Sequence, residues 1–198
     1  MSTETGHKRR VRQAFDRAAG RYDDAAVVQR EICARLAAFA RAHPCRRAVE
    51  RVLDAGCGTG YALGLLRAAH PGAELLAVDF APAMLARVAT STCLCADLER
   101  LPLRAACIDA LWSSLAVQWC TPTRALTEIA RVLRPGGCAW LATLGPATLH
   151  ELRTAFRTVD TAEHVLRFHD APVWAQAARS AGLRVVAIDQ GPSWARAA

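Results

Sequence analysis

The residues best suited to chemistry are an aspartate and a glycine turn in the first half of the chain. Residues 51–60 read Arg-Val-Leu-Asp-Ala-Gly-Cys-Gly-Thr-Gly, which places Asp54 just before Gly56, Gly58 and Gly60. An apolar strand that turns through glycines into a helix is typical of nucleotide binding, because glycine allows unusual backbone angles and lets a ligand touch the main chain. The helix that follows directs its first N–H groups at the turn.

Two further aspartates end the next two predicted strands. Asp79 lies 23 residues after Gly56, where a carboxylate can accept hydrogen bonds from both hydroxyls of a ribose. Asp97 can accept from an adenine amino group, beside the backbone N–H of Leu98 for a ring nitrogen. Each aspartate alone could be an ordinary cap or turn residue. Three at successive strand ends instead predict a nucleoside site.

The spacing of the glycines narrows the class of cofactor. Glycines at every second position differ from the G-x-G-x-x-G fingerprint of dinucleotide sites. The turn therefore favours a cofactor without a pyrophosphate. Together with Asp97, it disfavours a nicotinamide-dependent oxidoreductase.

Apolar patterning predicts strands that alternate with helices, which must position these residues. The expected strands are 51–55, 75–79, 93–97, 108–112, 138–144 and 183–188, and the expected helices are 8–19, 25–42, 61–70, a short one from 82, 122–133, 146–159 and 170–181. Mostly apolar strands alternating with helices indicate an α/β fold, with a parallel sheet covered on both faces. Ligands in such sheets bind beyond the carboxyl ends of the strands, where the strand order reverses.

We expect one cytoplasmic domain over residues 1–198, with an N-terminal helical lid or substrate segment at 1–45 and a core at 46–198. Hydrophobic residues make up 53% of the chain, which is enough for a substantial core. We expect no membrane segment, because no apolar run approaches roughly 20 residues. The N-terminus lacks the apolar stretch of a signal peptide. The eight cysteines show no paired C-x-x-C spacing, so we expect reduced thiols and no metal site.

The positive charge is concentrated at the N-terminus. The net charge is +7, and residues 1–50 contain 11 Lys/Arg against 6 Asp/Glu. A solvated helix surface would explain any single arginine. The sharper interpretation is a docking face for an acidic partner, either a nucleic acid or an acidic carrier protein.

Two sets of motifs carry resemblances to known families. The first set comprises residues 52–60, Asp79, Asp97 and Leu133-Arg-Pro-Gly-Gly137. It resembles the class I S-adenosylmethionine-dependent methyltransferases. The second set, over about residues 8–190, comprises Phe15-x-x-Ala18-Ala19-x-x-Tyr22, Gln29, Asp97-Leu-Glu-Arg-Leu-Pro-Leu103, Trp112-Ser-Ser-Leu-Ala-Val-Gln-Trp119, Thr143-Leu144 and His164-x-x-Arg167-Phe168. Within those methyltransferases, it resembles the malonyl-acyl-carrier-protein O-methyltransferases of biotin synthesis.

The resemblance implies a Rossmann-like three-layer sandwich that binds S-adenosyl-L-methionine and methylates the free carboxylate of a malonyl thioester on acyl-carrier protein or coenzyme A. It implies a monomer that binds neither nucleic acid nor membrane. The expected cofactor residues are Asp54, Gly56, Gly58, Gly60, Asp79, Phe80, Met84, Asp97, Leu98 and Ser113. Tyr22 and Arg167 are the expected catalytic residues. Gln29, Gln118, Trp119, His164 and Phe168 are the expected substrate residues.

The chemistry suits these residue types. A carboxylate is already an anion at neutral pH, so the reaction requires no general base to make the nucleophile. Positioning and desolvation can supply much of the acceleration. Arg167 can orient the malonyl carboxylate through a fork of hydrogen bonds, Tyr22 and Gln29 would close the pocket over the methyl group, and His164 is interpreted as holding a local turn or Arg167.

One departure from the family leaves alternatives open. The chain stops soon after the sixth expected strand, and a seventh, antiparallel strand between strands five and six is expected to be missing, as in a truncated C-terminal end. One alternative is a methyltransferase for another small molecule, which would not need His164 and Arg167. A second is a non-catalytic relative that keeps the cofactor site. Only charge favours a nucleic-acid methyltransferase.

Overall fold

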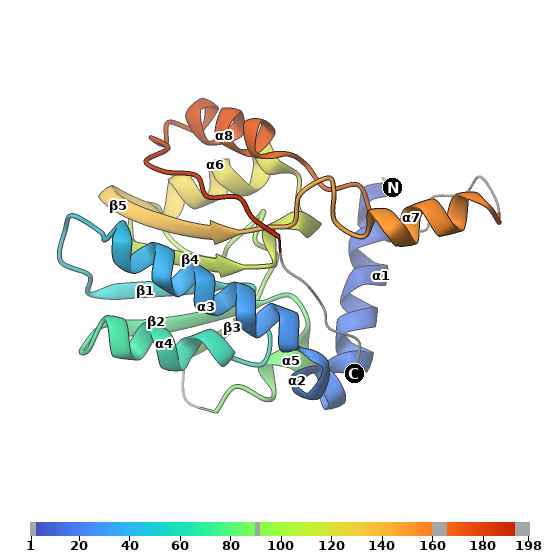
Figure 1. Cartoon of the computed structure of the whole chain (residues 1–198). Helices are drawn as coiled ribbons and strands as arrows, with labels where there is room; N and C mark the ends of the chain where they lie inside the picture. The colour runs from blue at the N-terminus through green and yellow to red at the C-terminus, as the bar shows by residue number, and fades with distance from the viewer. Residues whose placement is uncertain (1–2, 90–91, 160–165, 193–198) are drawn as a thin grey trace.

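A five-stranded parallel sheet forms the centre of the computed structural model, which describes residues 3–89, 92–159 and 166–192. The strand order is β3-β2-β1-β4-β5. Strands β2 and β3 are thus added on one side of β1, and β4 and β5 on the other, which places the point of strand-order reversal between β1 and β4. The strands are β1 (Arg51–Ala55), β2 (Glu74–Asp79), β3 (Thr92–Cys95), β4 (Ile108–Ser114) and β5 (Leu133–Ala142). This order and the covering helices (Figure 1) confirm the predicted Rossmann-like α/β fold.

Helices cover both faces of the sheet. On one face, α3 (Val27–Ala42) and α4 (Tyr61–Ala69) pack apolar side chains such as Leu36 and Leu63 against β1 and β4. On the other face, α6 (Pro122–Val132) and α8 (Ala171–Ser180) do the same, with Ile129 of α6 fully buried. Because both faces are covered, the inner strands are apolar along almost their whole length.

The N-terminal segment leaves these layers and crosses the carboxyl ends of the strands (Figure 1). It comprises α1 (Thr3–Ala18), the 3-10 turn η1 (Ala19–Arg21) and α2 (Tyr22–Ala25). The short helix α5 (Pro82–Leu85) follows β2 and packs against α1. A second short 3-10 turn, η2 (Val117–Trp119), follows β4. The edge at which ligands of such sheets bind is therefore covered by α1.

The other end of the sheet is fastened by a buried aspartate. The carboxylate of Asp109, at the start of β4, accepts hydrogen bonds from the backbone N–H groups of Glu50 and Arg51 at 3.1 and 3.0 Å. It also contacts the guanidinium groups of Arg47 and Arg134, both at 3.0 Å. These contacts compensate the burial of the charge and lower the pKa of Asp109. They also fix where the chain enters β1, and so where the glycine turn begins.

The largest differences from the sequence expectations concern three elements. Residues 183–188 form no strand. Their Val186 side chain is 67% exposed, and an apolar run becomes a strand only where a neighbouring edge supplies its hydrogen bonds. β5 begins at Leu133 rather than 138, with a register irregularity that absorbs the glycines. Helix α7 spans His150–Arg157 rather than starting at 146.

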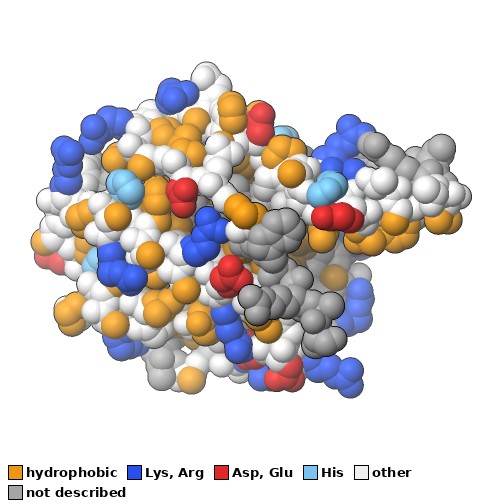
Figure 2. Space-filling view, in the orientation of Figure 1, with side chains coloured by type: hydrophobic (Ala, Val, Ile, Leu, Met, Phe, Trp, Pro, Cys, Tyr) orange, Lys and Arg blue, Asp and Glu red, His pale blue; other side chains and the backbone are white. Residues whose placement is uncertain are grey.

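Helix α7 projects from the body, and Figure 2 shows apolar side chains along it. Leu149 and Leu152 are about half exposed. Within the described ranges, no helix is long and apolar enough to cross a membrane.

Candidate active site

The glycine turn after β1 takes the shape that its sequence predicts. Gly56, Gly58 and Gly60 all have positive φ angles, of 81°, 55° and 91°, in the left-handed region that side chains with a Cβ avoid. The N–H groups of Gly56 and Cys57 both bond to the carbonyl of Val78 in β2, at 2.7 and 3.0 Å. The turn is thereby fixed against the end of the next strand.

Asp79 holds the turn from the side of β2. One carboxylate oxygen accepts from the N–H of Gly58 at 2.9 Å, and the other accepts from Ala81 at 2.9 Å. Burial is the largest influence on this carboxyl and raises its pKa, against the lowering effect of these backbone hydrogen bonds. Each oxygen can accept a further hydrogen bond, and the side chain lines a cavity. Asp79 is placed to bind a hydroxyl-bearing ligand while it also orders the turn.

Asp54 lies beneath the turn rather than on the cavity wall. Its side chain is 2% exposed, and within the described part of the chain its Oδ2 atom has no hydrogen-bond partner. Burial, reinforced by the nearby charge of Asp79, raises the pKa of Asp54 to about 8. A buried carboxylate without a partner is costly, so this atom marks a place where a cationic or hydrogen-donating ligand group would be stabilising.

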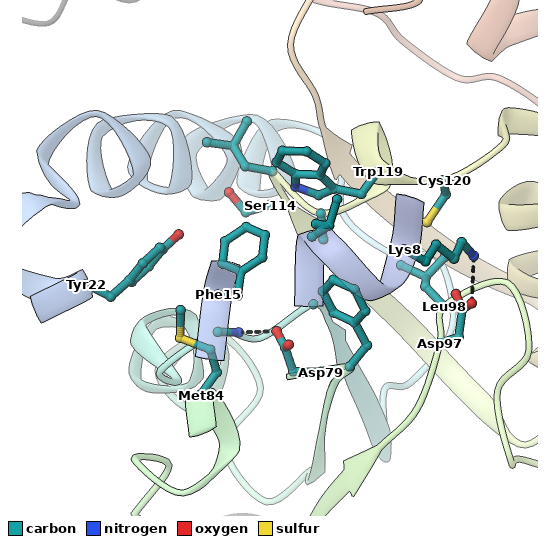
Figure 3. A pocket seen from close by; sticks show the side chains of 16 residues that line it. Lys8, Phe15, Tyr22, Asp79, Met84, Asp97, Leu98, Ser114, Trp119 and Cys120 are labelled. Atoms are coloured by element: carbon teal, nitrogen blue, oxygen red, sulfur yellow. Dashed lines mark hydrogen bonds and ion pairs between the residues drawn. The ribbon is translucent and has the colours of Figure 1, made fainter. Parts of the chain in front are cut away.

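At the far end of the cavity, Asp97 meets a lysine from α1. The Lys8 ammonium lies 2.6 Å from Asp97 Oδ2 and 2.7 Å from Glu99 Oε2. The other Asp97 oxygen accepts from the N–H of Glu99 at 3.0 Å. Figure 3 marks the contact between Lys8 and Asp97. The predicted adenine-binding carboxylate is therefore already engaged by a cation from the N-terminal helix.

Aromatic rings form the wall between these two ends (Figure 3). Phe15 of α1 packs edge-on against Trp119, with ring centroids 5.7 Å apart, and contacts Phe80 and Tyr22 at 6.2 and 6.3 Å. Burial, with help from Asp79, raises the pKa of the Tyr22 phenol. Tyr22 is therefore a neutral hydrogen-bond donor at physiological pH. The indole nitrogen of Trp119 is buried and, among the described residues, unpartnered.

A cavity of about 80 Å³ remains among these groups. Its lining comprises Lys8, Val11, Phe15, Tyr22, Gly56, Gly58, Asp79, Phe80, Met84, Asp97, Leu98, Ser114, Leu115, Ala116, Trp119 and Cys120. Nine residues of the sequence-based site are among them, and they include members of the predicted cofactor, catalytic and substrate groups. The cavity lies at the carboxyl ends of β1, β2 and β4, as the fold class requires.

The other predicted site residues lie outside this lining. Gly60 caps the start of α4, and Ser113 Oγ donates to the carbonyl of Ala55 at 2.7 Å inside the sheet. Gln118 donates to the carbonyl of Leu115 at 2.8 Å, which leaves its Oε1 buried and unpartnered among described residues. Gln29 lies on α3, half-buried.

The histidine–arginine–phenylalanine motif is placed only in part. His164 lies outside the described residues. Arg167 is exposed and Phe168 is half-buried, on the segment that leads into α8. The structure does not bring this segment into the cavity lining.

Sequence reasoning missed several lining residues. The cavity lining contains Ser114 rather than the expected Ser113. Strand β4 runs two residues further than expected, and successive residues of a strand point to opposite faces. Lys8 and Val11 carry no sequence signal beyond their place on an amphipathic helix. Phe15 belongs to the motif that ends at Tyr22, and that motif could have identified it.

The donor set fits S-adenosyl-L-methionine. The unpartnered Asp54 oxygen suits the cationic amino-acid end of that cofactor, and Asp79 suits its ribose hydroxyls. Asp97 with Leu98 suits its adenine. The cavity volume is smaller than the roughly 300–1,000 Å³ usual for ligand pockets, and residues of α1 form one of its walls.

Comparisons with known proteins show the family of the chain. A family model described as a methyltransferase domain matches residues 53–141. The malonyl-[acyl-carrier protein] O-methyltransferase of Dechloromonas aromatica is 52% identical over 91% of this chain and 68% of its own length. The protein of the same name from Laribacter hongkongensis is 46% identical over 92% of this chain and 66% of its own length. The chain thus spans about two thirds of the length of these relatives.

Solved structures show the same fold. The methyltransferase in a complex with the Haloferax volcanii activator Trm112 has a TM-score of 0.71 and 26% identity, over 89% of this chain and 78% of its own. A methyltransferase from Thermotoga maritima has a TM-score of 0.64 at 20% identity, over 85% and 78%. By its sequence relatives and its fold, the chain belongs to the malonyl-[acyl-carrier protein] O-methyltransferase family of S-adenosylmethionine-dependent enzymes.

Proposed function

We propose that this protein transfers a methyl group from S-adenosyl-L-methionine to the free carboxylate of a malonyl thioester carried by acyl-carrier protein, an early step of biotin synthesis in the cytoplasm. The observation that carries the proposal is the 52% identity to a malonyl-[acyl-carrier protein] O-methyltransferase across 91% of the chain.

The bound cofactor supplies an electrophilic methyl group on a sulfonium. The carboxylate needs no general base, so the protein's task is to align the reacting atoms and exclude water. Asp54, Asp79 and Asp97 would hold the cofactor. Phe15, Tyr22 and Trp119 would exclude water above the methyl group, and the Trp119 indole N–H is available to the acceptor because it has no partner among the described residues.

Arg167 is assigned to the malonyl carboxylate. A guanidinium can hold a carboxylate through two parallel hydrogen bonds and so fix its direction. Phe168, Gln118, Gln29 and His164 would complete the acceptor side. Because the segment of Arg167 lies outside the cavity lining, the proposal includes its approach when substrate binds.

The carrier protein would dock on the outer face of α1. Lys8, Val11 and Phe15 line the cavity, whereas Arg10 and Arg17 are exposed. Residues seven apart lie about two helical turns apart on one face, so these arginines form an outward basic stripe. Figure 2 shows Lys and Arg side chains over this part of the molecule. An acidic partner that docks there would deliver its tethered thioester next to the cavity. The proposed working form is a monomer that engages neither nucleic acid nor membrane.

The test is methylation of malonyl-carrier protein by the purified 198-residue chain, with cofactor binding measured by calorimetry in the same preparation. The expected result is a methyl ester on the malonyl group. For Arg167→Ala we expect kcat/KM to fall by about 100-fold, with the dissociation constant of S-adenosylhomocysteine unchanged. Undiminished methylation by Arg167→Ala would remove the substrate assignment. Cofactor binding without any methyl transfer would point to a different acceptor.

A further inference from the structure

Helix α1 is attached to the cofactor site at two separate points. At one end, Lys8 bridges the carboxylates of Asp97 and Glu99 at 2.6 and 2.7 Å. Two turns further along the helix, Asp16 accepts from the N–H of Ala83, at the start of α5, at 3.0 Å. Phe15 lies between these points against the aromatic wall. Helix α1 thus crosses the loops after β2 and β3, which carry two of the predicted cofactor carboxylates.

The Lys8 attachment is partly shielded from solvent. The side chains of Lys8 and Glu99 are 22% and 7% exposed, whereas that of Asp97 is 39% exposed. Glu99 is itself held by the backbone N–H of Thr121, ahead of α6, and lies 3.8 Å from Arg124. The hydrogen bonds to Asp97 and Glu99 raise the pKa of Lys8 against the effect of its burial. The ammonium therefore stays charged, and each carboxylate that it joins accepts a hydrogen bond from a backbone N–H group, Asp97 from Glu99 and Glu99 from Thr121.

Helix α1 forms one wall of the cofactor cavity. The free volume of this cavity is about 80 Å³, which is below that of an ordinary ligand pocket. Lys8, Val11 and Phe15 form its α1 wall. Outward movement of α1 would enlarge the cavity, and this movement requires the contacts of Lys8 to break. No motion of the sheet would have the same effect, because β1, β2 and β4 are hydrogen-bonded to one another.

We propose that Lys8 latches α1 across the cofactor cavity, so that S-adenosylmethionine and its demethylated product pass in and out when the contact of Lys8 with Asp97 and Glu99 opens. This inference uses the cofactor site of the proposed function and adds a positioning residue to it. The latch is independent of the identity of the methyl acceptor. Its closed form retains the Asp97 carboxylate for adenine, because Asp97 can accept more than the two hydrogen bonds already present.

The test is the rate at which S-adenosylhomocysteine binds to and leaves the full chain, followed by stopped-flow tryptophan fluorescence because Trp119 lines the cavity. In Lys8→Met, the association and dissociation rate constants are both expected to rise about tenfold, since truncating one partner of a shielded charge pair acts strongly on rates. The dissociation constant is expected to change by less than about threefold, because both rate constants change together. A residue that only contacted the cofactor would change the dissociation rate alone.

Matched variants separate the latch from other effects. Arg9→Met removes the same charge from the adjacent exposed position and is expected to leave both rates unchanged. Lys8→Arg keeps a cation that can reach both carboxylates and is expected to stay within about threefold of the unmodified protein. Glu99→Gln removes the partner side of the contact and is expected to accelerate exchange as Lys8→Met does, which keeps the test valid if Lys8→Met folds poorly.

Rate constants within twofold of the unmodified protein in both Lys8→Met and Glu99→Gln would overturn the latch. A change in dissociation alone would also overturn it and would make Lys8 a simple ligand contact. Because no methyl acceptor is present in this experiment, failure of the malonyl assignment leaves these outcomes unchanged.

Discussion

At the scale of single residues, the carboxyl of Asp54 is expected to lower the stability of the fold and to favour cofactor binding. Its Oδ2 atom lacks a partner among the described residues, and its burial raises its pKa to about 8. The folded pKa thus lies above the value of about 3.9 for an unfolded aspartate. The stabilising contribution of the neutral carboxyl is fully present below that unfolded pKa and is lost as the pH rises through 8. Without cofactor, Asp54 therefore weakens the fold at neutral and alkaline pH.

Asp54→Asn separates the effect of Asp54 on fold stability from its effect on cofactor binding. Without cofactor, this variant is expected to be more stable than the unmodified protein at pH 8, by about 2 kcal/mol, with a smaller difference at pH 5. Its affinity for S-adenosylhomocysteine is expected to fall at least about tenfold, because the charged acceptor is lost. Urea unfolding at the two pH values and calorimetry measure these quantities. If Asp54→Asn and the unmodified protein were equally stable at both pH values, Asp54 would already have a partner in solution.

Residue types and spacing predicted the carboxylates better than they predicted their partners. Asp79 and Asp97 reach the cavity because both end a parallel strand, and such strand ends share one edge. Lys8 was not foreseeable, because a lysine on an amphipathic helix is usually a solvated surface residue. Its role depends on how α1 folds back onto a loop 89 residues away, and this distance leaves no local pattern.

At the scale of elements, the turn between β1 and α4 is set by close packing. Gly56 has φ of 81°, and a Cβ added there would lie 2.1 Å from Cβ of Ala116, in the loop after β4. Gly64, inside α4, has open space where a Cβ would stand. Two glycines only eight residues apart therefore serve different purposes.

Gly56→Ala is expected to destabilise the protein by at least about 2 kcal/mol, through backbone strain and overpacking, and to weaken cofactor binding. Gly64→Ala is expected to stabilise it by about 1 kcal/mol, because alanine loses less conformational entropy in a helix. Denaturant unfolding of both variants gives the comparison. If the two changes had the same sign, the turn would not be packed as described.

Elements with internal signals were predicted well, and elements that depend on a neighbour were not. The apolar run and glycines of β1 give its bounds, Arg51–Ala55, without error. The apolar run at 183–188 has the composition of a strand, but the structure forms none there. Strand composition describes a surface that can be half buried, whereas the ladder itself requires a partner edge. The early start of β5 likewise depends on its pairing with Ile108.

At the scale of the whole molecule, charge is divided between the two faces of α1. Lys8 serves the inner face, and Arg10 and Arg17 are exposed on the outer one. The positive excess of residues 1–50 thus includes both a structural contact and the proposed docking stripe. Net charge alone predicted an acidic partner but not this division.

Arg10→Glu combined with Arg17→Glu is expected to raise the KM for malonyl-carrier protein about tenfold and to weaken its salt dependence. The KM for a malonyl thioester of a small uncharged thiol is expected to stay the same. Steady-state kinetics at two ionic strengths measure both. Arg41→Glu with Arg67→Glu makes the same change of charge on exposed positions of α3 and α4 and serves as the control. If the control pair raised the KM for malonyl-carrier protein equally, the effect would come from net charge and not from the basic stripe.

The position of the cavity-lining residues along the sequence has a consequence for how the protein can evolve. Every lining residue falls between Lys8 and Cys120, whereas the segment proposed to read the acceptor carboxylate surrounds Arg167. The donor cavity is therefore encoded within the first 120 codons, together with the proposed acceptor residues Gln29, Gln118 and Trp119. Mutation around codon 167 can change how the acceptor carboxylate is held while the donor cavity is inherited intact.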